Sequence, residues 1–180
     1  MKTVYQIDPV HSNIQFSVRH MMVSNVRGNF TGLTGKVVYD PDNLSASTVH
    51  AEIDAATINT FDASRDAHLK GADFLDVEHY PNMTFESTNV EKDGDGLKLT
   101  GNLTIHGITK PATLKVEEIA PEAKDPWGNT RAGASVKGKV NRTDFGLAWN
   151  TALETGGFLV GDDVKFDFEI QLVKAQTTAA

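Results

Sequence analysis

Apolar and polar residues alternate along most of this 180-residue chain, and the alternation is clearest near its C-terminal end. Between residues 163 and 173 every second side chain is apolar, with Lys, Asp, Glu and Gln side chains between them. A period of two is the mark of a strand with one buried and one solvent-exposed face. The same pattern, punctuated by turn residues such as Asp93-Gly94-Asp95-Gly96, predicts eight strands. They cover residues 12–20, 29–40, 47–55, 83–90, 97–105, 108–119, 130–141 and 163–173.

The segment 57–87 departs from this alternation and predicts a short helix over residues 61–70. Thr60 is the expected N-cap of this helix, and Lys70 suits the negative end of the helix dipole. Phe61, Arg65 and Leu69 are spaced four apart, so they would share one helix face. A helix this short must be held by packing on the sheet. The pattern therefore predicts a helical insertion between the third and fourth strands, while residues 21–27 would form only a helical turn after the first.

Eight antiparallel strands with one apolar face each predict an all-β fold, closed as a barrel or stacked as a sandwich. Tight hairpins between consecutive strands favour an up-and-down barrel of eight strands, which can hold one small ligand or be filled by its own side chains. The inward residues of strand 130–141 are only Ala, Val and Gly, and this favours a narrow, elongated apolar cavity. The alternative is a solid core filled by Phe16, Phe85, Phe166 and Phe168.

Composition narrows the functional classes. The apolar content of 39% and charged content of 23% are ordinary for a globular protein. The formal net charge of -7, with no cluster of Lys and Arg, argues against a nucleic-acid partner. The chain has no cysteine, which excludes disulfides, thiolate nucleophiles and cysteine-based metal sites.

No stretch of the sequence is long and apolar enough to predict a transmembrane helix, and the first residues show no apolar run of signal-peptide length. The sequence as it stands predicts a cytoplasmic protein, or a periplasmic one if a signal peptide has been removed. No linker or internal repeat is visible. We therefore expect a single domain over residues 1–174 and a disordered tail over residues 175–180.

Several ordered motifs give the chain a resemblance to a known family. They are IDPVHSNIQFSVRH from Ile7, GNFTGLTGKV from Gly28, RDAHLKGADFLDVEHYPNMTFEST from Arg65, LTIHGITKPATL from Leu103, VNRTDFGL from Val140 and VGDDVKFDFEI from Val160. Together they span nearly the whole chain. With these motifs the sequence resembles the YceI family of bacterial polyisoprenoid-binding proteins.

The resemblance implies an extended, lipocalin-like antiparallel barrel that encloses a long apolar chain, such as an isoprenoid quinone, a polyprenyl lipid or a fatty-acyl derivative. It implies a protein of the periplasm or the cytoplasm and a possible homodimer. It carries over no catalytic residue and no cofactor other than the bound lipid.

The candidate ligand-binding residues are the inward apolar side chains and two polar ones. His20 ends the first predicted strand on its apolar face, and Arg65 shares the helix face with Phe61 and Leu69, so these two could meet a polar head group. A structural role remains open for both, with Arg65 paired to Asp62, Asp66 or a strand carboxylate. The full set is Ile14, Phe16, Val18, His20, Val37, Phe61, Arg65, Leu69, Phe85, Leu99, Val136, Phe166 and Phe168.

Two kinds of catalytic chemistry are weaker alternatives. His50, Glu52 and Asp54 project from one face of a strand and could bind a divalent metal, but no second ligand cluster is identifiable nearby. Asp66 and His68 could act as an acid–base pair, but two residues apart on a helix they diverge. We therefore expect neither catalytic residues nor a metal. The main hypothesis is non-enzymatic carriage or sequestration of a long-chain lipid, and the alternative is a stress-related structural or interaction protein with a filled core.

Overall fold

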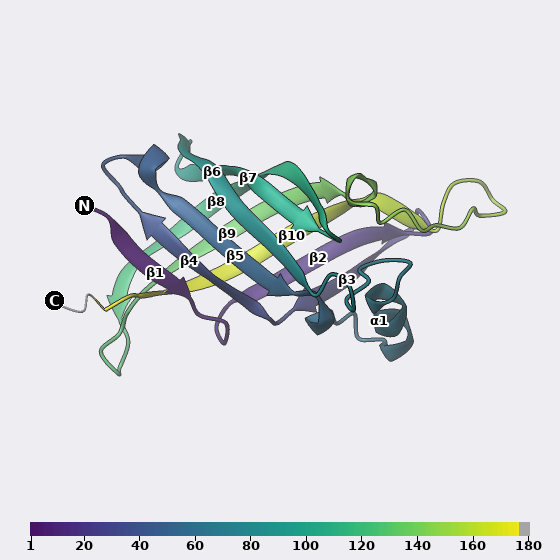
Figure 1. Ribbon diagram of the computed structural model, residues 1–180, viewed down its shortest axis with the longest axis horizontal. Coiled ribbons are helices and arrows are strands. Elements are labelled where there is room, and N and C mark those ends of the chain that lie inside the picture. The colour runs from purple at the N-terminus through teal and green to yellow at the C-terminus, as the bar shows by residue number, and fades with distance from the viewer. Residues whose placement is uncertain (177–180) are drawn as a thin grey trace.

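The computed structural model describes residues 1–176, which form ten antiparallel strands, one α-helix and three short 3₁₀ helices (Figure 1). The strands are β1 (Thr3–Ile7), β2 (Asn13–His20), β3 (Ser24–Phe30), β4 (Leu33–Tyr39), β5 (Thr48–Asp54), β6 (Asn82–Asp93), β7 (Gly96–Ile105), β8 (Ile108–Lys124), β9 (Thr130–Asn141) and β10 (Val160–Lys174). The helices are η1 (Leu44–Ala46), η2 (Ala55–Thr57), α1 (Ala63–Lys70) and η3 (Arg142–Phe145).

Eight strands close into a barrel in the order β1-β4-β5-β6-β7-β8-β9-β10, because β10 pairs back with β1. The pairing of Ile7 with Leu172 and of Tyr5 with Lys174 makes this closure. Further along, β10 pairs with β2 through residues 160–169, so β1 and β2 follow one another along the same edge of β10. The eight-stranded antiparallel barrel and its helical insertion between β5 and β6 are confirmed.

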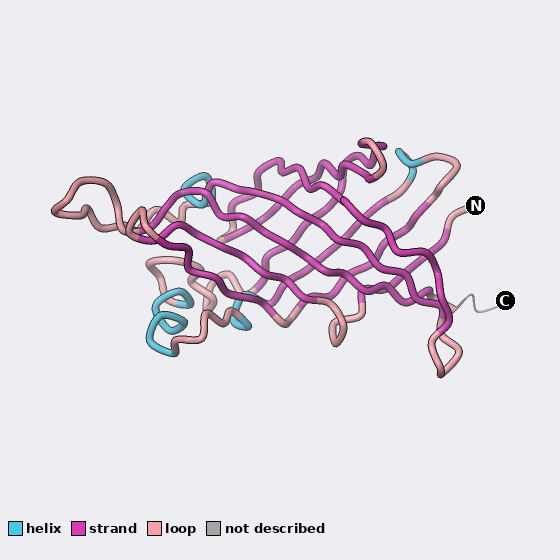
Figure 2. The backbone as a smooth tube through the Cα atoms, turned by 180° about the vertical axis from the view of Figure 1, so that it is seen from behind, coloured by secondary structure: helices cyan, strands magenta, loops and turns pink. Residues whose placement is uncertain are grey.

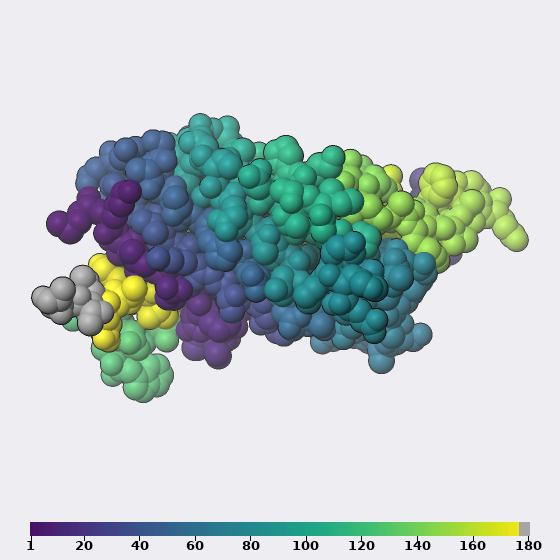
Figure 3. All heavy atoms as spheres, viewed as in Figure 1, coloured from purple at the N-terminus to yellow at the C-terminus, as the bar shows by residue number. Residues whose placement is uncertain are grey.

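The barrel is elongated, and its two ends differ (Figure 2). The N-terminus and the C-terminal end of β10 lie at one end, where η1 and the β8–β9 turn are also found, and α1 lies beside the other end. The long β9–β10 loop projects beyond the barrel at the α1 end (Figure 3). The structure therefore separates an end formed by β1, β4, β8 and β10 from an end formed by β2, β3, α1 and this loop.

The first part of the predicted strand pattern is wrong. Residues 3–7 form β1, which the sequence did not predict, and residues 24–30 form β3, where a helical turn was expected after residue 20. The predicted strand 29–40 is broken, because the N–H groups of Thr31 and Gly32 donate to the Thr57 hydroxyl instead of pairing in a strand. The side chain of Thr57 thus sets a bend that no period-two pattern reveals.

The helix starts two residues later than predicted. Asp62, rather than Thr60, is the N-cap, and its carboxylate accepts the N–H of Arg65. Phe61 precedes the helix with a positive φ of 63° and is 80% exposed. The expected helix face of Phe61, Arg65 and Leu69 is therefore wrong in its first member.

After β10, the N–H of Ala175 donates to the carbonyl of Val4 at 2.8 Å. Residues 177–180 lie outside the described residues, so the predicted disorder there is not described by the structure.

Candidate functional site

The inward faces of the barrel strands enclose a cavity of about 350 Å³, which we call the barrel chamber. Its wall is almost wholly aliphatic and aromatic, because the inward positions of β4 to β10 carry mostly apolar side chains. The small residues of β9, including Ala132, Ala134 and Val140, leave the space open. The interior is therefore hollow, as these small inward residues predicted. Six of the candidate residues line this chamber: Val37, Phe85, Leu99, Val136, Phe166 and Phe168.

A second cavity of about 610 Å³ lies between β2, β3, α1 and the β9–β10 loop, and we call it the helix chamber. Apolar side chains form much of its wall, but charged and polar side chains from several elements also reach it. Its candidate residues are Phe16, Val18, His20, Arg65, Leu69 and Phe166, of which Phe166 also borders the barrel chamber.

Two candidate residues line neither chamber. Ile14 is fully buried and packs in the core cluster that includes Phe16 and Phe30, so it contributes to the core without facing either cavity. Phe61 points to solvent at 80% exposure. The alternation correctly indicates that Ile14 is inside, but it does not distinguish a side chain facing a cavity from one packed in the core.

Arg65 is held at the edge of the helix chamber by Thr60, which is buried. Its Nε donates to the Thr60 hydroxyl and its Nη2 donates to the Thr60 carbonyl, both at 2.8 Å. The Thr60 hydroxyl donates in turn to Asp66 at 2.6 Å. The expected pairing with Asp66 is thus indirect, through Thr60, and the Nη1 donors of Arg65 take no part in these contacts.

Arg142 organises the β9–β10 loop, and sequence reasoning did not identify it as a site residue. Its side chain is 4% exposed, and it donates to the carbonyls of Leu147, Trp149, Val160 and Gly161 and, at 3.4 Å, to Asp162. Burial lowers the pKa of the guanidinium, opposed by the carboxylate of Asp162. Because these donors bind the loop at Leu147 and Trp149 and also the start of β10, Arg142 fixes the shape of the loop. The sequence gives no indication of this role, because the only local feature of Arg142 is that it follows a predicted strand.

An aromatic cluster borders the helix chamber between α1 and this loop. The ring of Trp149 meets His68 edge to face with centroids 4.8 Å apart, and Phe74 lies 5.1 Å from His68 and 5.4 Å from Trp149. The Nε2 atom of His68 is also 2.9 Å from a carboxylate oxygen of Asp73. The loop carrying Trp149 is thereby attached to the helix that carries Arg65.

The opposite end of the lumen has a smaller polar group. The Tyr5 hydroxyl donates to Glu122 at 2.5 Å, and Lys174 approaches the same carboxylate at 2.9 Å. Tyr5 and Glu122 both border the barrel chamber. Burial, together with the hydrogen bond to Glu122, raises the pKa of the Tyr5 phenol to about 12.

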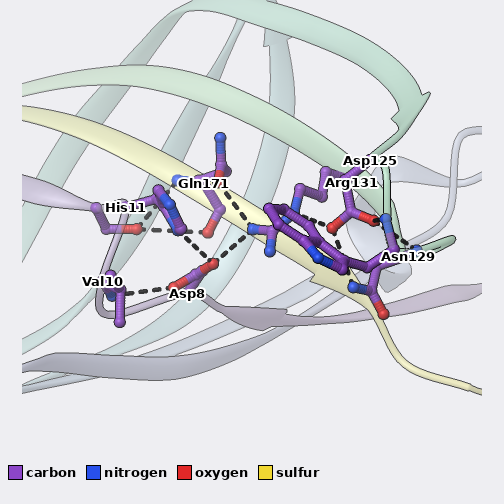
Figure 4. A network of polar contacts seen from close by, with 9 residues as sticks. Asp8, Val10, His11, Asp125, Asn129, Arg131 and Gln171 are labelled. Carbon is purple, nitrogen blue, oxygen red and sulfur yellow. Dashed lines mark hydrogen bonds and ion pairs between the residues drawn. The ribbon is translucent and has the colours of Figure 1, made fainter.

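A network around Arg131 ties the break between β1 and β2 to the β8–β9 turn (Figure 4). Arg131 donates to Asp8, Asp125 and Gln171 at 2.5, 2.8 and 2.8 Å. Burial alone would raise the pKa of Asp8, but hydrogen bonds from Arg131, His11 and the Val10 N–H lower it to about 2. Hydrogen bonds from Arg131 and Asn129 likewise hold the pKa of the Asp125 carboxyl well below its usual range.

The residues of the two catalytic alternatives have other partners. On β5, His50 pairs across the strands with Glu86. Within residues 1–176, no group of three or more His, Cys, Asp or Glu side chains is arranged to hold a metal ion. Asp66 is engaged by Thr60 and His68 by Asp73, so the acid–base pair is directed to separate partners.

Over the same residues, no helix combines the length and the apolar character needed to cross a bilayer.

Comparison with solved structures places this architecture among known ones. The structure superimposes on Burkholderia cenocepacia BcnA with a TM-score of 0.76 at 22% identity, covering 92% of this chain and 98% of that one. A Campylobacter jejuni YCEI protein gives a TM-score of 0.72 at 34% identity, with 88% and 90% covered. A polyisoprenoid binding domain from Saccharophagus degradans gives 0.67 at 15% identity, with 96% and 99% covered.

Sequence comparison agrees with the fold. The chain is 41% identical over 145 residues to Protein YceI of Escherichia coli O17:K52:H18, which covers 79% of this chain and 75% of that protein. Protein YceI of Salmonella newport is 40% identical over the same shares. A family model described as the YceI-like domain matches residues 5–172, from within β1 to the point on β10 where its pairing with β1 begins. With that domain spanning the closed barrel and both chambers, the chain belongs to the YceI family.

Proposed function

We propose that the protein binds one long apolar chain, of the isoprenoid or fatty-acyl type, inside the barrel and carries or sequesters it without chemical change. The observation that carries this proposal is the barrel chamber of about 350 Å³, whose wall is almost wholly aliphatic and aromatic. Ligand pockets of roughly 300–1,000 Å³ are typical of small-molecule sites. Each buried CH₂ contributes about 0.8 kcal/mol, so a long chain needs no polar contact to bind firmly.

The two chambers give the bound molecule a direction. The apolar tail would occupy the barrel chamber, while a polar end would lie in the helix chamber near His20 and Arg65, which both line it. The unused Nη1 donors of Arg65 suit an oxygen-bearing head group. The site residues are thus proposed to be the candidate residues that border the chambers, without Ile14 and Phe61.

The proposed ligand class is also suggested by the description of a structural neighbour. The Saccharophagus degradans neighbour is described as a polyisoprenoid binding domain. Shared fold alone does not fix a ligand. The hollow, apolar interior of this chain is the independent support for a long-chain ligand, and it also disfavours a filled-core structural protein.

Organic extraction of the purified protein followed by mass spectrometry tests the proposal. Ala134 borders the barrel chamber, and Ser135 is its neighbour on the opposite face of β9. We expect a co-purifying long-chain lipid in the wild type and in the control S135F, and its loss in A134F, which fills the chamber. Material without extractable lipid, combined with no thermal shift on adding isoprenoid quinones, would contradict the proposal.

A further inference from the structure

The barrel chamber and the helix chamber adjoin one another and share part of their walls. Both are bordered by Phe30, Met83, Ile105, Val140 and Phe166. These residues come from five strands, namely β3, β6, β7, β9 and β10, and they lie where the two chambers adjoin. We call these five residues the waist. A chain that occupies both chambers must pass between them.

Two members of the waist are aromatic rings held by other rings. Phe30 packs on Phe16 with centroids 5.5 Å apart, and Phe16 in turn lies over Gly28, where an added Cβ would come within 2.6 Å of the ring. Phe166 stacks on Phe168 at 5.8 Å. Such paired rings resist displacement because moving one removes its packing on the other.

Two further members are stiff for a local reason. Ile105 and Val140 are β-branched, so their χ1 rotamers are restricted by two heavy atoms on Cβ. Met83 differs from both, because it is unbranched and has three rotatable side-chain bonds. It is 6% exposed and sits at the start of β6, opposite Ile53 of β5.

We propose that Met83 is the movable member of the waist and sets whether a chain can extend from one chamber into the other. This inference rests on the proposed function. A ligand confined to one chamber would bind without a change at Met83. A longer chain of the same chemistry would bind only as the Met83 side chain turns aside, so this residue would select for chain length.

The test compares a short and a long prenyl alcohol, farnesol and solanesol, by the rate at which each displaces a polarity-sensitive dye. M83I keeps an apolar side chain but makes it β-branched. We expect M83I to slow the association of solanesol roughly tenfold and to change the association rate of farnesol less than about twofold. A tenfold effect matches the cost of forcing a β-branched side chain off its preferred rotamer. M83A is expected to speed solanesol association. The control L44I introduces a β-branched side chain at a residue that borders neither chamber, so both association rates should stay at the wild-type values.

The outcomes separate the two proposals. If the wild type binds both alcohols and M83I slows them equally, or not at all, Met83 has no gating role although the lumen binds chains. Binding of farnesol alone by the wild type also overturns passage through the waist. Failure of both alcohols to bind refutes the proposed function and this inference with it. M83L, a swap that cores usually tolerate, provides a folded variant of intermediate stiffness if M83I is unstable, and it should slow solanesol selectively.

Discussion

The indole of Trp149 lies edge to face against the imidazole of His68, with ring centroids 4.8 Å apart and an interplanar angle of 86°. This contact joins the β9–β10 loop to α1 directly over the helix chamber, which both residues border. Arg142 fixes the loop from beneath through the carbonyl of Trp149 at 2.9 Å. The loop is therefore held beside this chamber by the packing of Trp149 on His68 and Phe74, together with the hydrogen bond from Arg142.

Replacing Trp149 should loosen this loop. Aromatic pairs contribute about 0.5–1.5 kcal/mol beyond their buried area, so we expect W149A to release a bound dye or prenyl alcohol roughly tenfold faster. Stopped-flow dissociation measures this directly. The second tryptophan of the chain provides the control, because Trp127 is 81% exposed and borders neither chamber. A similar acceleration in W127A would show that the effect is not specific to the β9–β10 loop.

Pushing a wall side chain into the barrel chamber should weaken ligand binding. A Cβ at Gly138 would lie 2.5 Å from the Leu114 side chain, which borders the chamber, so G138A should push Leu114 into the lumen. Overpacking of this kind costs about 1–3 kcal/mol of stability. Calorimetry and dye binding should show both effects. Gly133 borders the chamber, but an added Cβ there meets nothing closer than 3.4 Å, so G133A should displace no wall side chain and retain near wild-type affinity. An equal loss of affinity in G133A would contradict the explanation.

Low pH should remove the contribution that the ionised Asp8 carboxylate makes to the stability of the fold. The pKa of this carboxyl is lowered from 3.8 to about 2 in the folded protein, so its ionised form stabilises the fold above pH 4. That contribution is lost as the pH falls from about 4 to about 2, because the unfolded chain binds the proton first. The melting temperature of the wild type should therefore fall steeply over this range.

R131M removes the partner of Asp8 and should lower the melting temperature at pH 7, with the difference from wild type shrinking toward pH 2. K139M breaks an ion pair with Asp163 in which both side chains are more than half exposed, at 58% and 55%. Exposed pairs contribute little, so this control should melt like the wild type at every pH. A constant difference between R131M and wild type across the range would argue against the Asp8 linkage.

High pH should destabilise the fold through ionisation of the Tyr5 phenol. Its pKa is raised from 10.0 to about 12 by burial and the hydrogen bond to Glu122, so its neutral form stabilises the fold up to about pH 10. This contribution is lost as the pH rises toward 12. Ultraviolet titration of the folded protein should show one of the three tyrosines ionising late. The late step should be absent in Y5F and retained in Y39F, and a late step that persists in Y5F would assign it elsewhere.

Much of the barrel could be predicted from the sequence because a period of two is a local property. Residues such as Phe166 and Phe168 alternate with Lys165 and Asp167, and this alone places the first pair inside and the second outside. The small residues of β9 likewise indicated a hollow interior. The helical insertion was predictable from the loss of alternation, although its first residue was not, because the N-cap depends on a backbone turn at Phe61.

The tertiary structure alone decided how the lumen is divided and closed. The break between β3 and β4 depends on the Thr57 hydroxyl, and the role of Arg142 depends on carbonyls up to 19 residues away. The waist is formed by side chains from five strands, whose meeting is set by non-local register. Alternation along one strand fixes which way a side chain points. Which side chains it contacts inside the lumen depends on the closure of β1 on β10, because that pairing brings together two strands from opposite ends of the sequence.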